Sequence, residues 1–172
     1  MLLLQVFTGG IQMKKSVNEL QKTAKQIRKD IITMLTTSAS GHPGGSLSCV
    51  EILTSLYFNV MNIDPQNNKN PDRDRFVLSK GHAAPALYSV LARRGYFDVD
   101  ELKGLRKMGS MLQGHPNMNL VPGVDMSTGS LGQGISAAVG MAIAGKIDNK
   151  EYRVYSLLGD GELEIGRAQV WT

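Results

Sequence analysis

The sequence predicts an α/β protein in which helices pack on a mostly parallel sheet. Two short runs of apolar and aromatic residues, at 75–79 and 153–158, have the composition of buried strands. Segments with apolar residues at helical spacing lie before and between these runs, so helix and strand alternate along the chain. The 172 residues suffice for one domain with its own core, and 42% hydrophobic residues is ordinary for a globular protein.

The composition indicates which partners and which cellular location to expect. The net charge is +4, and Glu19 and Asp30 interrupt the basic residues of the first helix, which predicts a solvated face and no nucleic-acid partner. The single cysteine, Cys49, lies in an apolar helical pattern and is expected to be packed. No apolar run approaches the ~20 residues of a membrane span, so we expect no membrane and take the cytoplasm as the default location. Residues 1–12 lack the features of a signal peptide and are interpreted as an extension with little structural role, before a domain at 13–172.

Two amphipathic helices are expected in the amino-terminal part. Ser16 and Glu19 form a capping box, and apolar residues then recur at helical spacing. Residues 38–46 are rich in glycine, serine and proline, which predicts a loop. Ser48 and Glu51 resemble a second capping box that opens the next helix.

The remaining helices follow the first predicted strand. A helix is expected from about Ala84 to Gly95, and a short one at 98–107. Residues 108–128 are rich in glycine, proline, methionine and asparagine, which predicts a long irregular segment of the kind that is often functional. Residues 135–144 are mostly small and apolar, which predicts a helix that packs closely on its neighbours.

The second predicted strand ends in Gly159-Asp160-Gly161. In α/β proteins ligands bind at the carboxyl ends of strands, where Asp160 could ligate Mg²⁺ and the N–H of Gly161 could face a phosphate. The alternative is a strand that ends in a tight Asp-Gly turn. A match of three residues is weak, and taken alone it favours the turn.

Each of the three histidines, His42, His82 and His115, directly follows a glycine in a loop or at a strand end. One such histidine would be interpreted as making local hydrogen bonds, but the shared context favours one common site for proton transfer or for binding hydroxyl groups. Their spacing does not indicate zinc. The glycine-rich residues 129–134 could line an anion or an aromatic ring, or could simply permit tight helix packing, and the sequence favours neither.

Together these segments resemble the amino-terminal, thiamine diphosphate-binding part of transketolase. The matching pieces occur in the family's order: SGHPGGSLS, DRFVLSKGHAAPALY, GHP, STGSLGQG and LLGDGEL. They extend over residues 14–163. The related deoxyxylulose-phosphate synthase shares the cofactor, but its first motif is not GHPGG, so it is the weaker alternative.

The resemblance implies a role for each histidine. His42 corresponds to the residue that contacts the sugar near its reacting carbon, and His82 to the one near the diphosphate and the substrate. His115 corresponds to the histidine that binds the donor's hydroxyl groups. The implied reaction moves a two-carbon ketol unit between sugar phosphates, with the carbanion chemistry supplied by the cofactor.

The resemblance also implies the cofactor-binding residues and the fold. Gly129, Ser130 and Leu131 correspond to the segment that lines the cofactor's rings. Asp160 corresponds to the Mg²⁺ ligand and Gly161 to an amide that contacts the diphosphate. The implied fold is the thiamine diphosphate-binding fold, with helices on a mostly parallel sheet.

The sequence departs from the family at its carboxyl end. Ile165 replaces an acidic residue, residues 167–168 look like an insertion, and the strand with a second Mg²⁺ ligand is absent. The pyrimidine-binding domain is missing, which makes the fold incomplete at the C-terminus. We therefore expect part of a transketolase, inactive alone, that forms a homodimer or joins a partner chain carrying that domain. A non-catalytic truncated product, or an assembly partner of a full-length or split transketolase, is the alternative.

Overall fold

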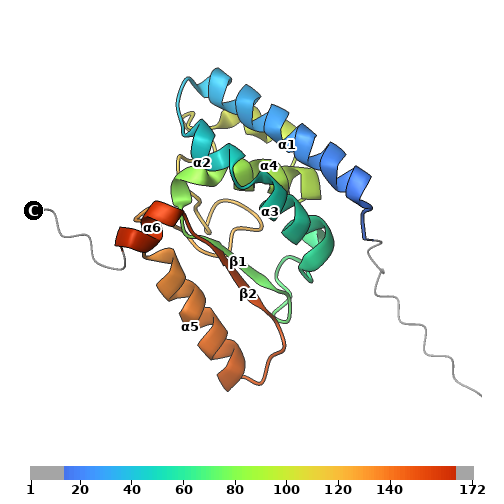
Figure 1. The fold of residues 1–172 in the computed structure, drawn as a ribbon, viewed down its shortest axis with the longest axis vertical. Helices are drawn as coiled ribbons and strands as arrows, with labels where there is room; N and C mark the ends of the chain where they lie inside the picture. Colours follow the sequence, from blue (N-terminus) through green and yellow to red (C-terminus); the bar gives the residue numbers. More distant parts are fainter. Residues whose placement is uncertain (1–13, 166–172) are drawn as a thin grey trace, which may run out of the picture.

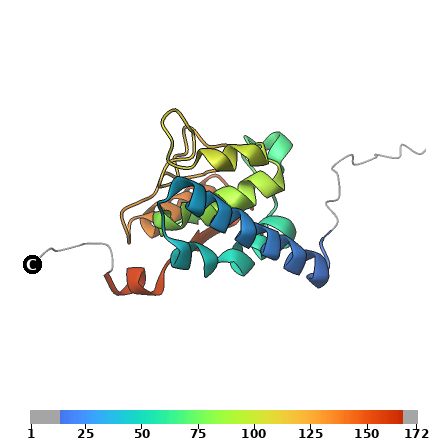
Figure 2. The same ribbon diagram turned by 90° about the horizontal axis from the view of Figure 1, so that it is seen from above.

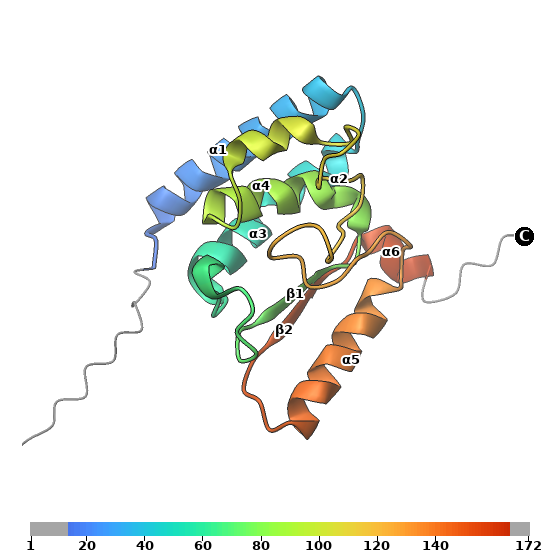
Figure 3. The ribbon, with the colours of Figure 1, turned by 180° about the vertical axis from the view of Figure 1, so that it is seen from behind.

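The computed structural model describes residues 14–165, which form helical layers on both sides of a small sheet (Figures 1 and 3). Helix α5 (Gly134–Ile147) lies on one side and contacts both strands, while α3 (Val50–Ser55) and α4 (Ala84–Arg94) lie on the other (Figure 1). Seen from above, α1 (Val17–Ser38) crosses the outside of that second group of helices (Figure 2). The α/β fold is confirmed. The extension predicted at 1–12 and the insertion at 167–168 lie outside the described residues.

The sheet contains the two predicted strands. Strand β1 (Arg75–Leu78) pairs in parallel with β2 (Val154–Leu157), with Phe76 opposite Tyr155. Phe76 belongs to the main hydrophobic core, and its ring meets that of Tyr57 edge-on at 5.5 Å between centroids. Residues that alternate along a strand point to opposite faces, so the two helical layers each bury one face of the sheet.

Helix α1 begins where the sequence predicts. The Glu19 N–H donates to the Ser16 hydroxyl, and the Ser16 N–H donates to the Glu19 carboxylate at 2.8 Å, so the capping box is complete. The buried residues recur at helical spacing: Ala24, Ile27, Ile31 and Met34. This stripe packs against α3 and α4 and closes the outer side of the core.

The predicted loop at 38–46 is partly wrong, because α2 (Pro43–Leu47) occupies its second half. Proline suits the first turn of a helix, since its fixed φ is helical and its missing N–H has no helical acceptor there. The three-glycine composition of the segment hid this short helix.

The second predicted capping box is also wrong. Cys49 holds the N-cap position of α3, and the Ser48 hydroxyl donates instead to the Gly45 carbonyl. The Glu51 carboxylate accepts from Arg28 of α1. Helix α3 then continues as a π-helical turn at Leu56–Val60. Cys49 itself is buried, as predicted.

The later elements follow the sequence closely, except that the short helix predicted at 98–107 is a 3-10 helix over Val99–Gly104. Helix α4 ends at Gly95, whose φ of +96° favours glycine. The long segment before α5 is irregular, as expected, and α6 (Asp160–Ile165) follows β2 directly. Shorter 3-10 turns complete the described chain: Pro65–Asn67, Gly81–Ala83 and Val99–Gly104.

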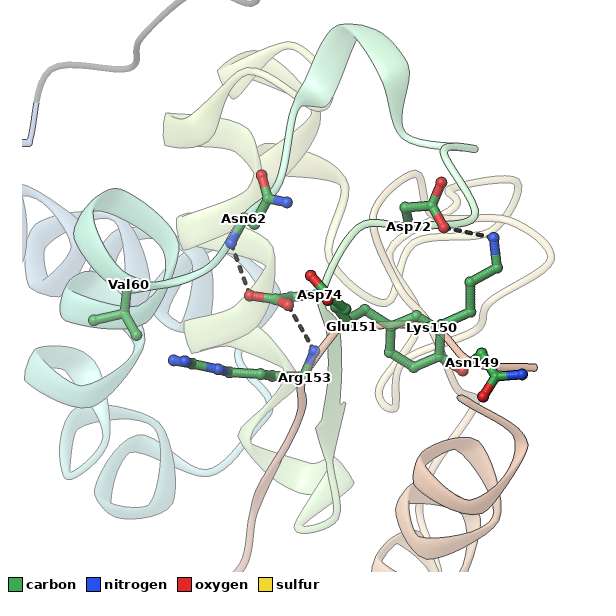
Figure 4. Close-up of a pocket in the computed structure, with 9 residues that line it drawn as sticks. Val60, Asn62, Asp72, Asp74, Asn149, Lys150, Glu151 and Arg153 are labelled. Atoms are coloured by element: carbon green, nitrogen blue, oxygen red, sulfur yellow. Dashed lines mark hydrogen bonds and ion pairs between the residues drawn. The ribbon is translucent and has the colours of Figure 1, made fainter. Parts of the chain in front are cut away.

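The strands are tied together at their amino ends. Asp74 directly precedes β1, is 5% exposed, and accepts hydrogen bonds of 2.8 Å from the backbone N–H groups of Asn62 and Arg153 (Figure 4). Nearby, the Lys150 ammonium pairs with Asp72 at the rim of the same hollow, which has a volume of about 530 Å³. Asp74 therefore joins three segments at the end of the sheet opposite the histidine-bearing loops.

A second aspartate anchors the irregular segment to the sheet. Asp125 accepts a hydrogen bond of 2.8 Å from the Phe76 N–H and forms an ion pair with the guanidinium of Arg73. This pair lies largely out of solvent, so the segment is fixed to β1.

No helix within residues 14–165 is long and apolar enough to cross a membrane. Helix α5 nevertheless carries exposed apolar residues one helical turn apart: Ile135, Val139, Ile143 and Ile147.

Candidate functional site

The candidate site forms where β1 and β2 end. Strand β1 leads through Ser79 and Lys80 into the turn that carries His82, and β2 leads through Gly159 into α6. Parallel strands present their carboxyl ends at the same edge of a sheet, and ligands of α/β proteins bind there. The loops that carry the predicted site residues thus start side by side.

His42 and His82 are neighbours. His42 holds the N-cap position of α2, and its ring meets the His82 ring edge-on with 5.2 Å between centroids. A Cβ added to Gly45 would lie 2.9 Å from Nε2 of His82, so the glycine makes room for that ring. Residues 40 positions apart along the chain, in two of the quoted motifs, therefore meet in one place.

His115 completes the group from a third segment. A Cβ added to Gly129 would lie 3.4 Å from the His115 ring, so His115 faces the glycine-rich loop. His115 also lies close enough to His82 for its charge to lower the pKa of His82. The structure therefore brings the three histidine side chains together.

The electrostatic environment keeps two of these rings neutral. Burial lowers the pKa of His82 below its usual 6.5, with further lowering by positive charge on His42, Lys80 and His115. Burial likewise lowers the pKa of His115, followed by the charge of Arg106. Both imidazoles are therefore neutral at pH 7, the form that can accept a proton or a hydrogen bond.

Arg106 joins two histidine loops. Its guanidinium donates to the Ser40 hydroxyl at 2.9 Å, two residues before His42. A Cβ added to Gly114 would lie 3.0 Å from the same guanidinium, which explains why glycine precedes His115. Arg106 was missed by the sequence analysis, because one more basic residue in a polar segment has no distinguishing signal.

The glycine-rich loop packs tightly against the end of β1. A Cβ added to Gly81 would lie 2.8 Å from the Gly129 nitrogen, and one added to Gly134 would lie 2.6 Å from Cα of Ser79. The Thr128 hydroxyl donates to the Leu78 carbonyl at 2.6 Å. Close packing, one of the two interpretations of this loop, is therefore present.

The same loop also borders a hollow of about 260 Å³, whose lining includes Gly129 and Ser130. Ser130 is exposed and Leu131 is half-buried. The loop thus has an accessible side on which a ligand could lie, in addition to the side that packs on β1.

Asp160 and Gly161 open α6. The predicted alternative of a tight turn is wrong, because Asp160 is the first residue of the helix. Its carboxylate is exposed and has no hydrogen-bond or ion-pair partner within residues 14–165. Within residues 14–165, and apart from the adjoining residues and the helix's own backbone, no atom lies within 4 Å of where a Cβ of Gly161 would be, so this side of the backbone is open.

The groups at this end of the sheet are better suited to binding a diphosphate than to holding a metal ion without further ligands. Within the described part of the chain, no group of three or more His, Cys, Asp or Glu side chains could hold a metal ion. Asp160 can supply one hard oxygen, whereas Mg²⁺ takes six ligands in near-octahedral geometry. The open backbone at Gly161 leaves room for a ligand, and the N–H group of a neutral histidine can donate a hydrogen bond to a diphosphate oxygen.

Two buried charges in the site were missed by the sequence analysis. Lys80, 8% exposed, donates to the Gly45 carbonyl at 3.0 Å and to the Ser48 hydroxyl at 3.3 Å. Glu162, 3% exposed, accepts from the backbone of two loops and from a serine. Both lie within the quoted motifs, next to strand ends, and that position is the only signal that could have identified them.

Comparison with known proteins identifies the family. Residues 19–169 match the family described as "Transketolase, thiamine diphosphate binding domain". A 6-deoxy-6-sulfo-D-fructose transketolase subunit of Clostridium sp. (strain MSTE9) is 48% identical over 159 residues, which cover 92% of this chain and 57% of that protein. Human transketolase is also 48% identical, over 92% of this chain but 25% of its own length.

Solved structures agree. The transketolase of Campylobacter jejuni superposes with a TM-score of 0.81 and 35% identity, over 87% of this chain and 25% of that chain. The Leishmania mexicana enzyme gives a TM-score of 0.80 with 36% identity, over 88% of this chain and 24% of that chain. The chain therefore spans about half the length of the subunit relatives and about a quarter of the length of the other transketolases. It belongs to the transketolase family, of which it contains an amino-terminal, thiamine diphosphate-binding segment.

Proposed function

We propose that this chain supplies the diphosphate-binding part of a transketolase that transfers a two-carbon ketol unit between sugar phosphates. The observation that carries the proposal is the grouping of His42, His82 and His115 beside Gly129, at the carboxyl ends of parallel strands. The names of two relatives, a 6-deoxy-6-sulfo-D-fructose transketolase subunit and an apulose-4-phosphate transketolase subunit, support an anionic sugar as substrate.

The proposed roles follow from position and protonation. His42 and His115 bind sugar hydroxyls, and the lowered pKa of His115 leaves its ring able to accept a proton at neutral pH. His82 and the open backbone at Gly161 face the diphosphate. Thiamine diphosphate, when bound, supplies the carbanion-stabilising chemistry.

The accessible side of the glycine-rich loop is the proposed place for the cofactor's rings. Gly129 lies beside His115, Gly129 and Ser130 line the hollow described above, and neither these residues nor Leu131 carry a charge. A loop held tightly to β1 keeps its orientation while its other side receives a flat ligand.

Asp160 is the proposed Mg²⁺ ligand of this segment. One carboxylate cannot satisfy the ion, so the diphosphate and groups outside the described residues must provide the other ligands. Weak binding of Mg²⁺ and cofactor by this chain alone follows from that shortage.

We also propose that the working enzyme needs more protein than this chain. Several relatives are named as transketolase subunits, which supports a homodimer or a partner chain that carries the pyrimidine-binding domain. The exposed apolar residues of α5 favour association of some kind, so a non-catalytic assembly partner remains the second candidate function. The proposed location is the cytoplasm.

Calorimetry with thiamine diphosphate and Mg²⁺ tests the assigned site. We expect weak binding that Asp160→Ala abolishes. Asp148→Ala, which changes an exposed aspartate at the carboxyl end of α5, should leave the binding unchanged. Micromolar affinity that survives Asp160→Ala would refute the site.

A turnover assay tests whether this chain needs a partner that carries the pyrimidine-binding domain. Mixed with xylulose 5-phosphate, ribose 5-phosphate and the cofactor, the purified chain should transfer no ketol unit. Turnover by the chain alone would contradict the proposal that a pyrimidine-binding domain is required. Absence of turnover after a pyrimidine-binding partner is added would favour the assembly-partner function.

A further inference from the structure

One buried carboxylate connects three backbone segments of the candidate cofactor site. Glu162 accepts a hydrogen bond from the Ser79 hydroxyl, one of 2.8 Å from the Gly132 N–H and one of 3.0 Å from the Gly159 N–H. Ser79 directly follows β1, Gly132 lies in the glycine-rich loop, and Gly159 follows β2. The three donors therefore come from the three segments that lead to His82, Gly129 and Asp160.

These bonds are more than a local helix cap. Only Gly159 is a sequence neighbour of Glu162, at a separation of 3 residues. Gly132 and Ser79 are separated from it by 30 and 83 positions, so two of the three bonds connect distant parts of the chain. A cap on α6 would need only the first.

The energetics require that all three bonds form. Glu162 is 3% exposed, and no Lys, Arg or His lies within ion-pair distance of it within residues 14–165. A buried carboxylate is strongly destabilising unless hydrogen bonds replace its water, and neutral donors are all it has here. Movement of any one segment would leave part of the charge unsatisfied, so the three segments are held together. We call Glu162 with its three hydrogen bonds the clasp.

We propose that Glu162 is a positioning residue that fixes these three segments in the arrangement that receives thiamine diphosphate. The proposal rests on the proposed function and adds a residue to it that does not itself touch the cofactor. The carboxylate orients the turn before His82, fixes the inner side of the glycine-rich loop, and sets the direction in which Asp160 leaves β2.

The charge of Glu162 provides an independent reporter. Among the groups that face His82, Glu162 is the one that raises the pKa of that histidine, against burial and the positive charges of His42, Lys80 and His115. Neutralising Glu162 must therefore lower the pKa of His82 further, whether or not cofactor is present.

The test uses the complete chain, Glu162→Gln, and nitrogen-15 NMR without cofactor. Glutamine keeps the size but turns an amide NH₂ toward groups that are themselves donors. Glutamine keeps one of the two acceptor oxygens, so we expect amide exchange to accelerate by about tenfold or more at Gly132 or at Gly159, whichever faces the new NH₂ group. The pKa of His82 should fall. Glu164→Gln, an exposed carboxylate on the same helix, should change neither reading.

A second measurement relates the clasp to the cofactor. Glu162→Gln should weaken binding of thiamine diphosphate with Mg²⁺ by about tenfold relative to Glu164→Gln. Glu162→Asp keeps the charge but has a side chain one methylene shorter, so it should restore the pKa of His82 without restoring the cofactor affinity. If neither the unmodified chain nor its mixture with a partner that carries the pyrimidine-binding domain binds cofactor, the proposed function fails, while the exchange data still test the three hydrogen bonds of Glu162.

Three results would overturn the proposal: unchanged exchange at both glycines in Glu162→Gln, the same changes in Glu164→Gln, or cofactor affinity that does not respond to Glu162. If Glu162→Gln does not fold, the unmodified chain still tests the proposal, because its Gly132 and Gly159 amides must exchange at least about tenfold slower than the amides of an unstructured peptide. Unprotected amides at both positions would refute the clasp.

Discussion

Asp74 offers the sharpest test of how the sheet is held. Its two carboxylate oxygens accept 2.8 Å hydrogen bonds from the N–H groups of Asn62 and Arg153, and the residue is 5% exposed. Asp74→Asn preserves the shape but replaces one acceptor with an NH₂ group that faces a backbone donor. The change removes one charge-assisted bond and leaves one buried N–H unsatisfied, which should cost about 2–3 kcal/mol of the free energy of unfolding.

Urea denaturation followed by far-UV circular dichroism measures this loss directly. Because the whole domain has only about 5–15 kcal/mol of stability, the midpoint should shift clearly while the slope stays constant. The matched control is Asp72→Asn, two residues away in the same hollow (Figure 4). The side chain of Asp72 is 62% exposed, and its ion pair with Lys150 lies in solvent, so little change is expected. A loss below about 0.5 kcal/mol for Asp74→Asn, or equal losses for both variants, would refute the reasoning.

Other predictions follow from the site and from the surface. Gly81→Ala should destabilise the fold and weaken cofactor binding, because its Cβ would lie 2.8 Å from the backbone at Gly129. Gly44→Ala should be neutral in both assays, because its Cβ would meet no atom of the described residues within 4 Å beyond its chain neighbours and its own helix backbone. Arg106→Gln should raise the pKa of His115 toward 6.5 in an NMR titration, and a fall would show that the guanidinium acts otherwise. Burial lowers the pKa values of both His82 and His115 in the folded protein, so the unfolded chain binds protons more readily as the pH drops below about 6.5. The free energy of unfolding should therefore decrease below that pH and level off above it. Denaturation at pH 7.5 and at pH 5.5 tests whether the lower pH gives the smaller free energy of unfolding. Ile143→Glu should reduce concentration-dependent association seen by light scattering, and an unchanged profile would exclude the α5 surface as its cause.

Local signals predicted the elements whose causes are local. The capping box at Ser16 and the glycine at 95 fix the ends of α1 and α4 through neighbours within four residues, and both predictions are confirmed. The strands were predicted for the same reason, from short apolar runs bounded by polar residues and glycine. The second capping box failed because Glu51 found a distant partner, Arg28, and such a competition is invisible in a local pattern.

The candidate site shows the same division. The shared Gly-His context indicated one site for the three histidines, since the glycines remove side chains where rings must approach, and the structure groups them. Lys80 and Glu162 were missed because a charged residue is expected at the surface, and burial depends on partners tens of residues away. The sugar-binding and cofactor-binding roles of the site residues, and Mg²⁺ at Asp160, stay predictions.

The pairing of β1 with β2 has a consequence for how the molecule is made. Asp74 accepts from the N–H of Arg153, 79 positions later in the chain, and within residues 14–165 β1 pairs with no strand other than β2. On the ribosome, the first strand therefore leaves the exit tunnel with its pairing edge uncovered and remains so while the next half of the domain is synthesised. Closing so long a loop carries an entropic cost before any stabilisation is gained. Folding of this chain should accordingly be slow, and the nascent polypeptide should depend on chaperones over the interval between the two strands.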